Sequence, residues 1–214
     1  MTTILEEQVP TLKENIIREI RNLSDEYQKN QGLILSEDDL KCHIFRKIYD
    51  LIRHYHRMKT HDSNITGSPL HSEIRFYDEE GKLSLVPDIT ILDPGGMSIK
   101  HGMSVRIMDK RLAYGKLPTK GFEFKGKAII IEIKFEKSRK GISEATIQKI
   151  RIDLGKFDRL IERHNRPDED NNIFGIMVVF NKTNKCNPLF NQLVQDYETN
   201  ENVKIVYGTG NVIF

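Results

Sequence analysis

The sequence is poor in cysteine and has no long apolar segment. Cys42 and Cys186 are the only cysteines and form no C-x-x-C pair, so we expect neither a zinc site nor a disulfide framework. The longest apolar runs are far shorter than the roughly 20 residues that span a bilayer. The N-terminal segment carries acidic residues where a secretory signal is basic. These absences predict a cytoplasmic protein without membrane association.

Two common catalytic signatures are also absent. The chain contains no G-x-x-x-x-G-K-[ST] phosphate loop, and Gly208-Thr209-Gly210 is not followed by a helical pattern, so nothing indicates nucleotide hydrolysis. No G-x-S-x-G elbow occurs, so no sequence motif points to a serine nucleophile. The chemistry of the chain has to be sought in other polar residues.

Length and charge predict one domain with a basic insertion. A chain of 214 residues with 38% apolar and 30% charged residues is enough for one α/β core, so we expect a single domain over residues 1–214. The net charge is only +2, but residues 95–127 contain eight basic and two acidic side chains. That segment is therefore strongly positive, and the remainder of the chain is negative.

Apolar periodicity predicts a mixed sheet flanked by helices. Residues 70–77 and 83–92, joined by a short polar turn, are typical of an antiparallel hairpin. Further strands are predicted at 128–135, 173–180 and 203–207, and helices at 9–27, 36–56, 143–163 and 189–197. The fold class is therefore α/β, with a mixed central sheet. Residues 1–33 form an extra N-terminal helical extension.

Three charged residues lie in predicted strands that are otherwise apolar. Asp88 is in the second strand of the hairpin, and Glu132 and Lys134 are in the following strand. A charge in an apolar strand is costly unless another charge meets it. Because side chains alternate along a strand, Glu132 and Lys134 share one face. We expect two carboxylates and one ammonium to converge there.

Two converging carboxylates favour a Mg²⁺ site. Mg²⁺ takes one or two protein carboxylates and completes its shell with waters and phosphate oxygens. Asp88 and Glu132 are the expected ligands, the backbone carbonyl of Ile133 is a further one, and Mn²⁺ is expected to substitute. Lys134 would either orient the attacking water or stabilise the anionic transition state. The structural alternative, a plain ion pair between Asp88 and Lys134, leaves Glu132 unpaired.

The same residues resemble the signature of a known family. Pro87-Asp88, followed by Glu132-Ile133-Lys134, is similar to the PD-(D/E)xK motif of the restriction-endonuclease-like nucleases. The resemblance covers residues 36–180. It implies a restriction-endonuclease-like fold and a metal-dependent endonuclease that hydrolyses phosphodiester bonds, with Asp88, Glu132 and Lys134 as catalytic residues.

The resemblance also implies polar residues on the two flanking helices. An acid on the helix before the hairpin would be Glu37, which equally fits a first-turn acid facing the helix dipole. On the helix after Glu132-Ile133-Lys134, the candidates are Gln148, Lys149 and Asp153. For any one of these three, a solvated helix face is the simpler interpretation.

The basic insertion at residues 95–127 points to a nucleic acid partner. Five basic residues are expected to contact phosphates: Lys110, Arg111, Lys116, Lys120 and Lys149. DNA is the expected substrate in preference to RNA, and a homodimer or a larger nuclease complex would help a chain of this size to cut two strands. The alternative function is a catalytically silent nucleic-acid-binding or assembly subunit of a larger defence or mobile-element complex.

Overall fold

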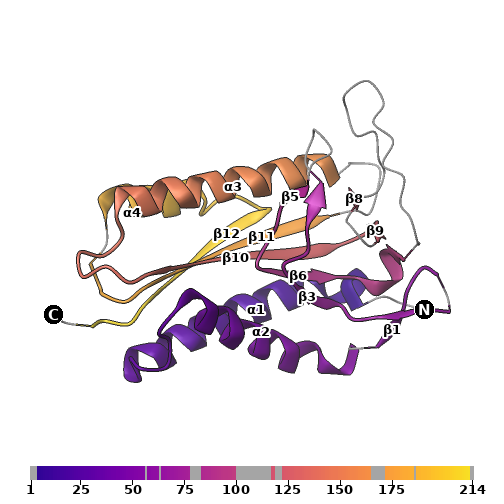
Figure 1. Ribbon diagram of the computed structural model, residues 1–214, viewed down its shortest axis with the longest axis horizontal. Helices are drawn as coiled ribbons and strands as arrows, with labels where there is room; N and C mark the ends of the chain where they lie inside the picture. The colour runs from indigo at the N-terminus through magenta and orange to yellow at the C-terminus, as the bar shows by residue number, and fades with distance from the viewer. Residues whose placement is uncertain are drawn as a thin grey trace.

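The fold is centred on a five-stranded mixed sheet that lies between two layers of helices (Figure 1). A computed structural model describes residues 4–55, 57–62, 64–77, 83–99, 117–118, 122–164, 172–185 and 187–212. The strand order is β12-β11-β10-β6-β3. The strands are β3 (Leu70–Ser72), β6 (Ile89–Leu92), β10 (Ala128–Glu136), β11 (Ile173–Asn181) and β12 (Val203–Thr209). Strands β10, β11 and β12 are parallel, whereas β3 and β6 are antiparallel to their neighbours.

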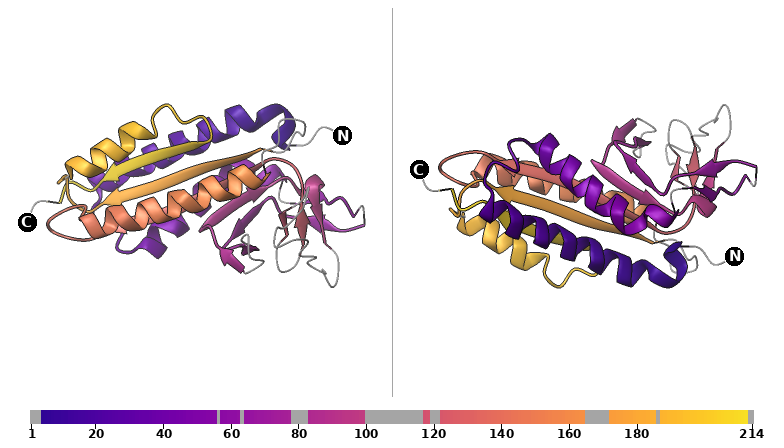
Figure 2. Two further views of the ribbon diagram at one scale, coloured as in Figure 1. Left: turned by 90° about the horizontal axis from the view of Figure 1, so that it is seen from above. Right: turned by 90° about the horizontal axis from the view of Figure 1, so that it is seen from below.

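Each face of the sheet is covered by a pair of helices (Figures 1 and 2). Helices α1 (Ile4–Lys29) and α2 (Glu37–Ile52) cover one face, and α3 (Glu144–His164) and α4 (Pro188–Asp196) cover the other. In β10, Ile131 and Ile133 belong to the apolar core beneath α1 and α2, whereas Ile130 belongs to the core beneath α3. Glu132 and Lys134 have the parity of Ile130, so their side chains lie on the α3 face.

The predicted helices form, with shifted ends. The Ser36 side chain caps α2 by accepting a hydrogen bond from the backbone N–H of Asp39 (3.0 Å). The α-helix ends at Ile52 and continues as a 3₁₀ turn, Arg53–Tyr55. The predicted range for the first helix, residues 9–27, is shorter than α1. The prediction was based only on the spacing of apolar residues, which does not locate the ends of the helix. No described helix has the length and apolar character needed to cross a bilayer.

The predicted hairpin forms, but both of its strands are interrupted. Strand β3 pairs with β6, while β4 (Phe76–Tyr77) and β5 (Leu83–Leu85) form a separate antiparallel pair. The breaks have local causes: Glu73 adopts a left-handed conformation (φ 53°), and Pro87 has no N–H to donate. The prediction that Asp88 lies inside a strand was therefore wrong, because β6 begins one residue later.

The basic insertion is described only in part. A 3₁₀ turn, Pro94–Gly96, leads into a small sheet of β7 (Met97–Ser98), β9 (Glu123–Phe124) and β8 (Leu117–Pro118), and another short pair joins β1 (Met58–Lys59) to β2 (Thr66–Gly67). Lys110, Arg111, Lys116 and Lys120 lie outside the described residues. The strand residues that flank the insertion, Leu92 and Ala128, are paired, and Ala128 is four residues or roughly 13 Å along β10 from Glu132.

Candidate active site

The candidate site lies where β10 extends beyond the end of β6. Their pairing ends at Ile131 opposite Ile89, which leaves the next N–H groups on that edge of β10 without a strand partner in the described structure. Two carboxylates accept from them instead. Asp88 Oδ2 accepts from the N–H of Ile133 (2.8 Å), and Glu37 Oε2 accepts from the N–H of Phe135 (3.0 Å). The strand edge is thus capped by two acids from separate elements.

A chain of ion pairs lies on the α3 face of β10. Lys134 Nζ is 2.7 Å from Glu132 Oε1 and 2.9 Å from Asp153 Oδ2 on α3. Lys156, one turn further along α3, also contacts Asp153. The side chains of Glu132 and Asp153 are only 13% and 9% exposed. Lys134 is therefore held between two nearly buried carboxylates. The alternation of side chains along the strand predicted that Glu132 and Lys134 share a face, but it did not predict the contact with Asp153.

A second lysine reaches the site from α2. Lys41 Nζ is 2.7 Å from Glu73 Oε1, 3.7 Å from Asp38 Oδ1 and 3.9 Å from Asp88 Oδ1. Glu73 also donates its backbone N–H to the carbonyl of Asp88 (3.1 Å). Asp88 is therefore contacted twice: Glu73 binds its backbone carbonyl, and the ammonium of Lys41 lies near its carboxylate.

Asp88 and Glu132 hold protons more tightly than ordinary carboxylates. Burial raises the pKa of Glu132 to about 7, and the nearby charges of Asp88 and Asp153 add to this, although Lys134 opposes it. Burial also raises the pKa of Asp88; the hydrogen bond from Ile133 and the charge of Lys134 oppose that rise, and Glu37 adds to it. Burial is thus the main cause of both raised pKa values, and the charge of Lys134 offsets it only in part.

Lys134 and Asp153 are held in their charged forms. Burial would lower the pKa of Lys134, but its contacts with Glu132 and Asp153 outweigh burial and raise it. Burial would raise the pKa of Asp153, but hydrogen bonds from Lys156 and Lys134 outweigh burial and lower it. At neutral pH the cluster thus contains charged lysines, a charged Asp153 and a Glu132 that is close to its titration midpoint.

The donor atoms fit a hard divalent cation better than zinc. The described residues contain no group of three His, Cys, Asp or Glu side chains arranged around one point. They do offer two neighbouring carboxylates, Asp88 and Glu132. The N–H and C=O of a strand residue face the same side, so the carbonyl of Ile133 faces the edge that Asp88 caps. An all-oxygen set that leaves room for waters suits Mg²⁺, whereas structural zinc requires four protein ligands.

The predicted catalytic residues are brought together. Asp88, Glu132 and Lys134 converge, and Glu37 lies beside them although its side chain is exposed. Among the three candidates on α3, Asp153 is buried in the cluster, whereas Gln148 and Lys149 are exposed. Lys41 was not predicted. Its position four residues after Glu37, on the same face of α2, was the signal that could have identified it.

The chain is an α/β protein with a five-stranded mixed sheet flanked by helices, and its charged cluster joins α2, β10 and α3 to the residue that precedes β6. Comparisons with protein-family models, with curated proteins and with solved structures found no significant match.

Proposed function

We propose that the chain is a Mg²⁺-dependent endonuclease that hydrolyses phosphodiester bonds of DNA. The observation that carries the proposal is the convergence of two partly buried carboxylates, Asp88 and Glu132, with Lys134 where β10 extends beyond β6. Buried acids with raised pKa values beside a fixed ammonium are costly for folding, and such groups gather at functional sites. A divalent cation would favour the charged forms of these two carboxylates.

The order of the elements supports a restriction-endonuclease-like fold as part of the proposal. Helix α2 precedes an antiparallel pair, β3 and β6, and Asp88 directly precedes the second strand of that pair. Strand β10 carries Glu132 and Lys134, and α3 then leads to the parallel strand β11. This is the order in which the PD-(D/E)xK signature is expected to occur.

The residues of the site have separate roles in the proposed reaction. Asp88 and Glu132 would hold Mg²⁺, together with the carbonyl of Ile133. The bound ion would lower the pKa of a coordinated water and offset the charge that develops on the phosphate. Lys134 has three N–H donors, and two are directed at Glu132 and Asp153. Its third donor would bind the attacking water or a phosphate oxygen.

The proposed substrate contacts come from exposed basic residues. Lys149 and Arg151 are exposed on α3, the helix that supplies Asp153. Contacts of such side chains with phosphates would make DNA binding strongly dependent on salt and weakly dependent on sequence. Contacts by the insertion lysines and by Arg111 remain a prediction.

Cleavage of supercoiled plasmid tests the proposal. The parent chain should nick or linearise the plasmid with Mg²⁺ or Mn²⁺ and should stop when EDTA is added. Asp88→Asn and Lys134→Met should each lower the rate by about a hundredfold or more. The matched controls are Asp50→Asn and Lys140→Met, which change exposed residues outside the cluster. Equal cleavage by parent and Asp88→Asn, or cleavage that persists in EDTA, would contradict it.

One observation favours the alternative of a catalytically silent binding or assembly subunit. Lys134 is already ion-paired on both sides, so part of the site's charge is balanced without a metal. That alternative predicts binding of double-stranded DNA, single-stranded DNA or RNA in gel-shift experiments, with no cleavage of any of them in Mg²⁺ or Mn²⁺.

A further inference from the structure

Lys41 is a second ammonium beside the proposed metal ligands, and the reaction proposed above does not use it. It extends from α2, which covers one face of the sheet, whereas Lys134 lies on the face that α3 covers (Figure 2). Lys41 Nζ is 3.9 Å from Asp88 Oδ1, and Lys134 Nζ is 2.7 Å from Glu132 Oε1. The carboxylate pair is therefore approached by two ammonium groups that come from opposite helical layers.

Lys41 has hydrogen-bond donors that no described residue uses. Its one hydrogen bond among these residues goes to Glu73 Oε1 (2.7 Å). Its distances to Asp38 (3.7 Å) and to Asp88 (3.9 Å) exceed the usual hydrogen-bond range, which ends at about 3.2 Å. An ammonium has three N–H groups, so two are left for a ligand. The side chain is 20% exposed, which leaves the ammonium open to a substrate.

The ion pairs of Lys41 contribute little to the stability of the fold. Its two closest acids, Glu73 and Asp38, are 61% and 88% exposed, and water screens ion pairs with such partners. Asp88, in contrast, is only 22% exposed and is a proposed metal ligand. A role in the chemistry beside Asp88 therefore explains the position of Lys41 better than a role in folding.

We propose that Lys41 stabilises the leaving oxygen of the phosphodiester, an inference that rests on the proposed function. In the hydrolysis, the oxygen of a water forms a bond to phosphorus, and the bond from phosphorus to the leaving oxygen breaks. The electron pair of that bond stays on the leaving oxygen. This oxygen takes a proton from solvent, and the attacking water gives one to solvent. A donor directed at charge that develops in this way raises a rate by about a hundredfold to a thousandfold.

The same inference gives the two lysines different functions. In two-metal nucleases, one ion stabilises the attacking oxygen and another stabilises the leaving oxygen. The described residues offer Asp88 and Glu132 as neighbouring carboxylates for one ion, and no group of three acids for another. Lys41 would supply the second positive charge, at the leaving oxygen. Lys134 would act on the attacking water or on a phosphate oxygen that does not leave.

Replacing the leaving oxygen by sulfur tests the role of Lys41. The bond that the parent cuts most often is mapped first, and the ends of its products identify the leaving oxygen. A short duplex with this bond is then made with oxygen or with sulfur at the leaving position, because a thiolate needs less stabilisation to leave. In single turnovers, Lys41→Met should cut the oxygen duplex about a hundredfold more slowly than the parent, and the sulfur duplex within about fivefold of the parent.

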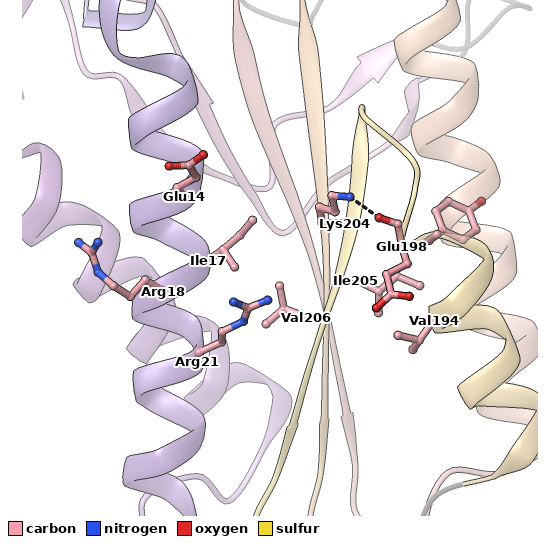
Figure 3. Close-up of a pocket in the computed structure, with 10 residues that line it drawn as sticks. Glu14, Ile17, Arg18, Arg21, Val194, Glu198, Lys204, Ile205 and Val206 are labelled. Carbon is pink, nitrogen blue, oxygen red and sulfur yellow. Dashed lines mark hydrogen bonds between the residues drawn. The ribbon is translucent and has the colours of Figure 1, made fainter.

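Two other lysines supply the controls. Lys134→Met should slow the cleavage of both duplexes by a similar factor, because its proposed contact is not with the leaving atom. Lys204→Met should cut both duplexes as fast as the parent. Lys204 lines a groove beside β12, at the opposite edge of the sheet, and donates a hydrogen bond to the carbonyl of Glu198 (2.6 Å; Figure 3). Circular dichroism should show that each variant is folded, and Lys41→Gln replaces Lys41→Met if the latter is not.

Calorimetric titration with Mn²⁺ gives a readout that does not depend on cleavage. Lys41→Met should bind one Mn²⁺ per chain at least as tightly as the parent, because the substitution removes a positive charge 3.9 Å from Asp88. Weaker Mn²⁺ binding would overturn the inference, since Lys41 would then act through the metal site. Parent-like cleavage of the oxygen duplex, or an equal loss of rate on both duplexes, would also overturn it. A parent that cuts no DNA in Mg²⁺ or Mn²⁺ instead overturns the proposed function on which this role depends.

Discussion

Asp88 is bound to the backbone of β10 through a 2.8 Å hydrogen bond from the N–H of Ile133 to its carboxylate. The acid therefore takes the place of the strand partner that β6 no longer provides. Because the bond is made to a backbone group, substitutions of neighbouring side chains leave it in place. It also holds the carboxylate next to Glu132, which precedes Ile133 in β10, and so joins the two halves of the proposed metal site.

Stability should depend on pH through Glu132. Its folded pKa of about 7 is above its ordinary value of 4.5, so the folded state binds this proton more tightly than the unfolded state. The resulting stabilisation is complete below the ordinary value and is lost as pH rises through about 7. Between pH ~5 and ~8 in EDTA, the parent should lose about 1–3 kcal/mol of unfolding free energy relative to Glu132→Gln. Urea denaturation measures this, and parallel pH profiles would contradict it.

Asp153 should act by positioning Lys134. Asp153→Asn removes one of the two ion pairs of Lys134 and should lower kcat by about 10-fold to 100-fold with a smaller change in KM. The charge of Asp153 raises the pKa of Glu132, so the variant should also shift the midpoint of pH-dependent Mg²⁺ binding to lower pH. Asp158→Asn, on the same helix and bonded to Tyr197, is the control. A purely structural role would leave the midpoint unchanged.

Lys41 should lower the pKa values of two acids at once. The pKa of Glu73 is lowered chiefly by its hydrogen bond from Lys41, and the charge of Lys41 opposes the effect of burial on the pKa of Asp88. Lys41→Met should raise both pKa values, as measured by NMR titration of the carboxyl carbons. Lys47→Met is a matched control, because Lys47 is on the same helix and pairs with Glu26 instead (2.9 Å). Unchanged titration of Asp88 in Lys41→Met would show that the 3.9 Å approach has no electrostatic effect.

Lys149 should contribute to DNA affinity without contributing to sequence preference. Lys149→Ala should weaken binding to all duplexes similarly and reduce the slope of log affinity against log salt concentration by about one. Lys29→Ala, at the end of α1, should leave the slope unchanged. Fluorescence anisotropy at several salt concentrations measures both the affinity and this slope. A loss of affinity confined to certain sequences would indicate a base contact instead.

The parts of the site that lie within one strand were predictable from sequence. The alternation of side chains is a local property, so the shared face of Glu132 and Lys134 followed from their spacing alone, and their 2.7 Å contact confirms it. The apolar run at residues 128–135 likewise predicted a strand, and β10 occupies that range. The helices and the pairing order of the hairpin followed from equally local signals.

The parts of the site that depend on packing between elements were not predictable. The contact of Lys41 with Asp88 depends on how α2 crosses the sheet, because the spacing of Lys41 from Glu37 indicates only that both lie on one face of α2. The end of β3 at Ser72 depends on the left-handed conformation of Glu73, a residue type that rarely adopts it. Asp153 was one of three polar candidates on its helix, and only the position of α3 against β10 distinguishes it from the exposed Gln148.

The most direct test of the central claim, that Asp88 and Glu132 share one divalent cation, is a crystal soaked with Mn²⁺. The soak should be made at pH ~8, where a carboxyl with a pKa of about 7 has lost its proton. The account predicts an anomalous difference peak between the two carboxylates, and no peak there in Asp88→Asn crystals soaked in the same way. Well-ordered carboxylates with no Mn²⁺ between them would contradict it.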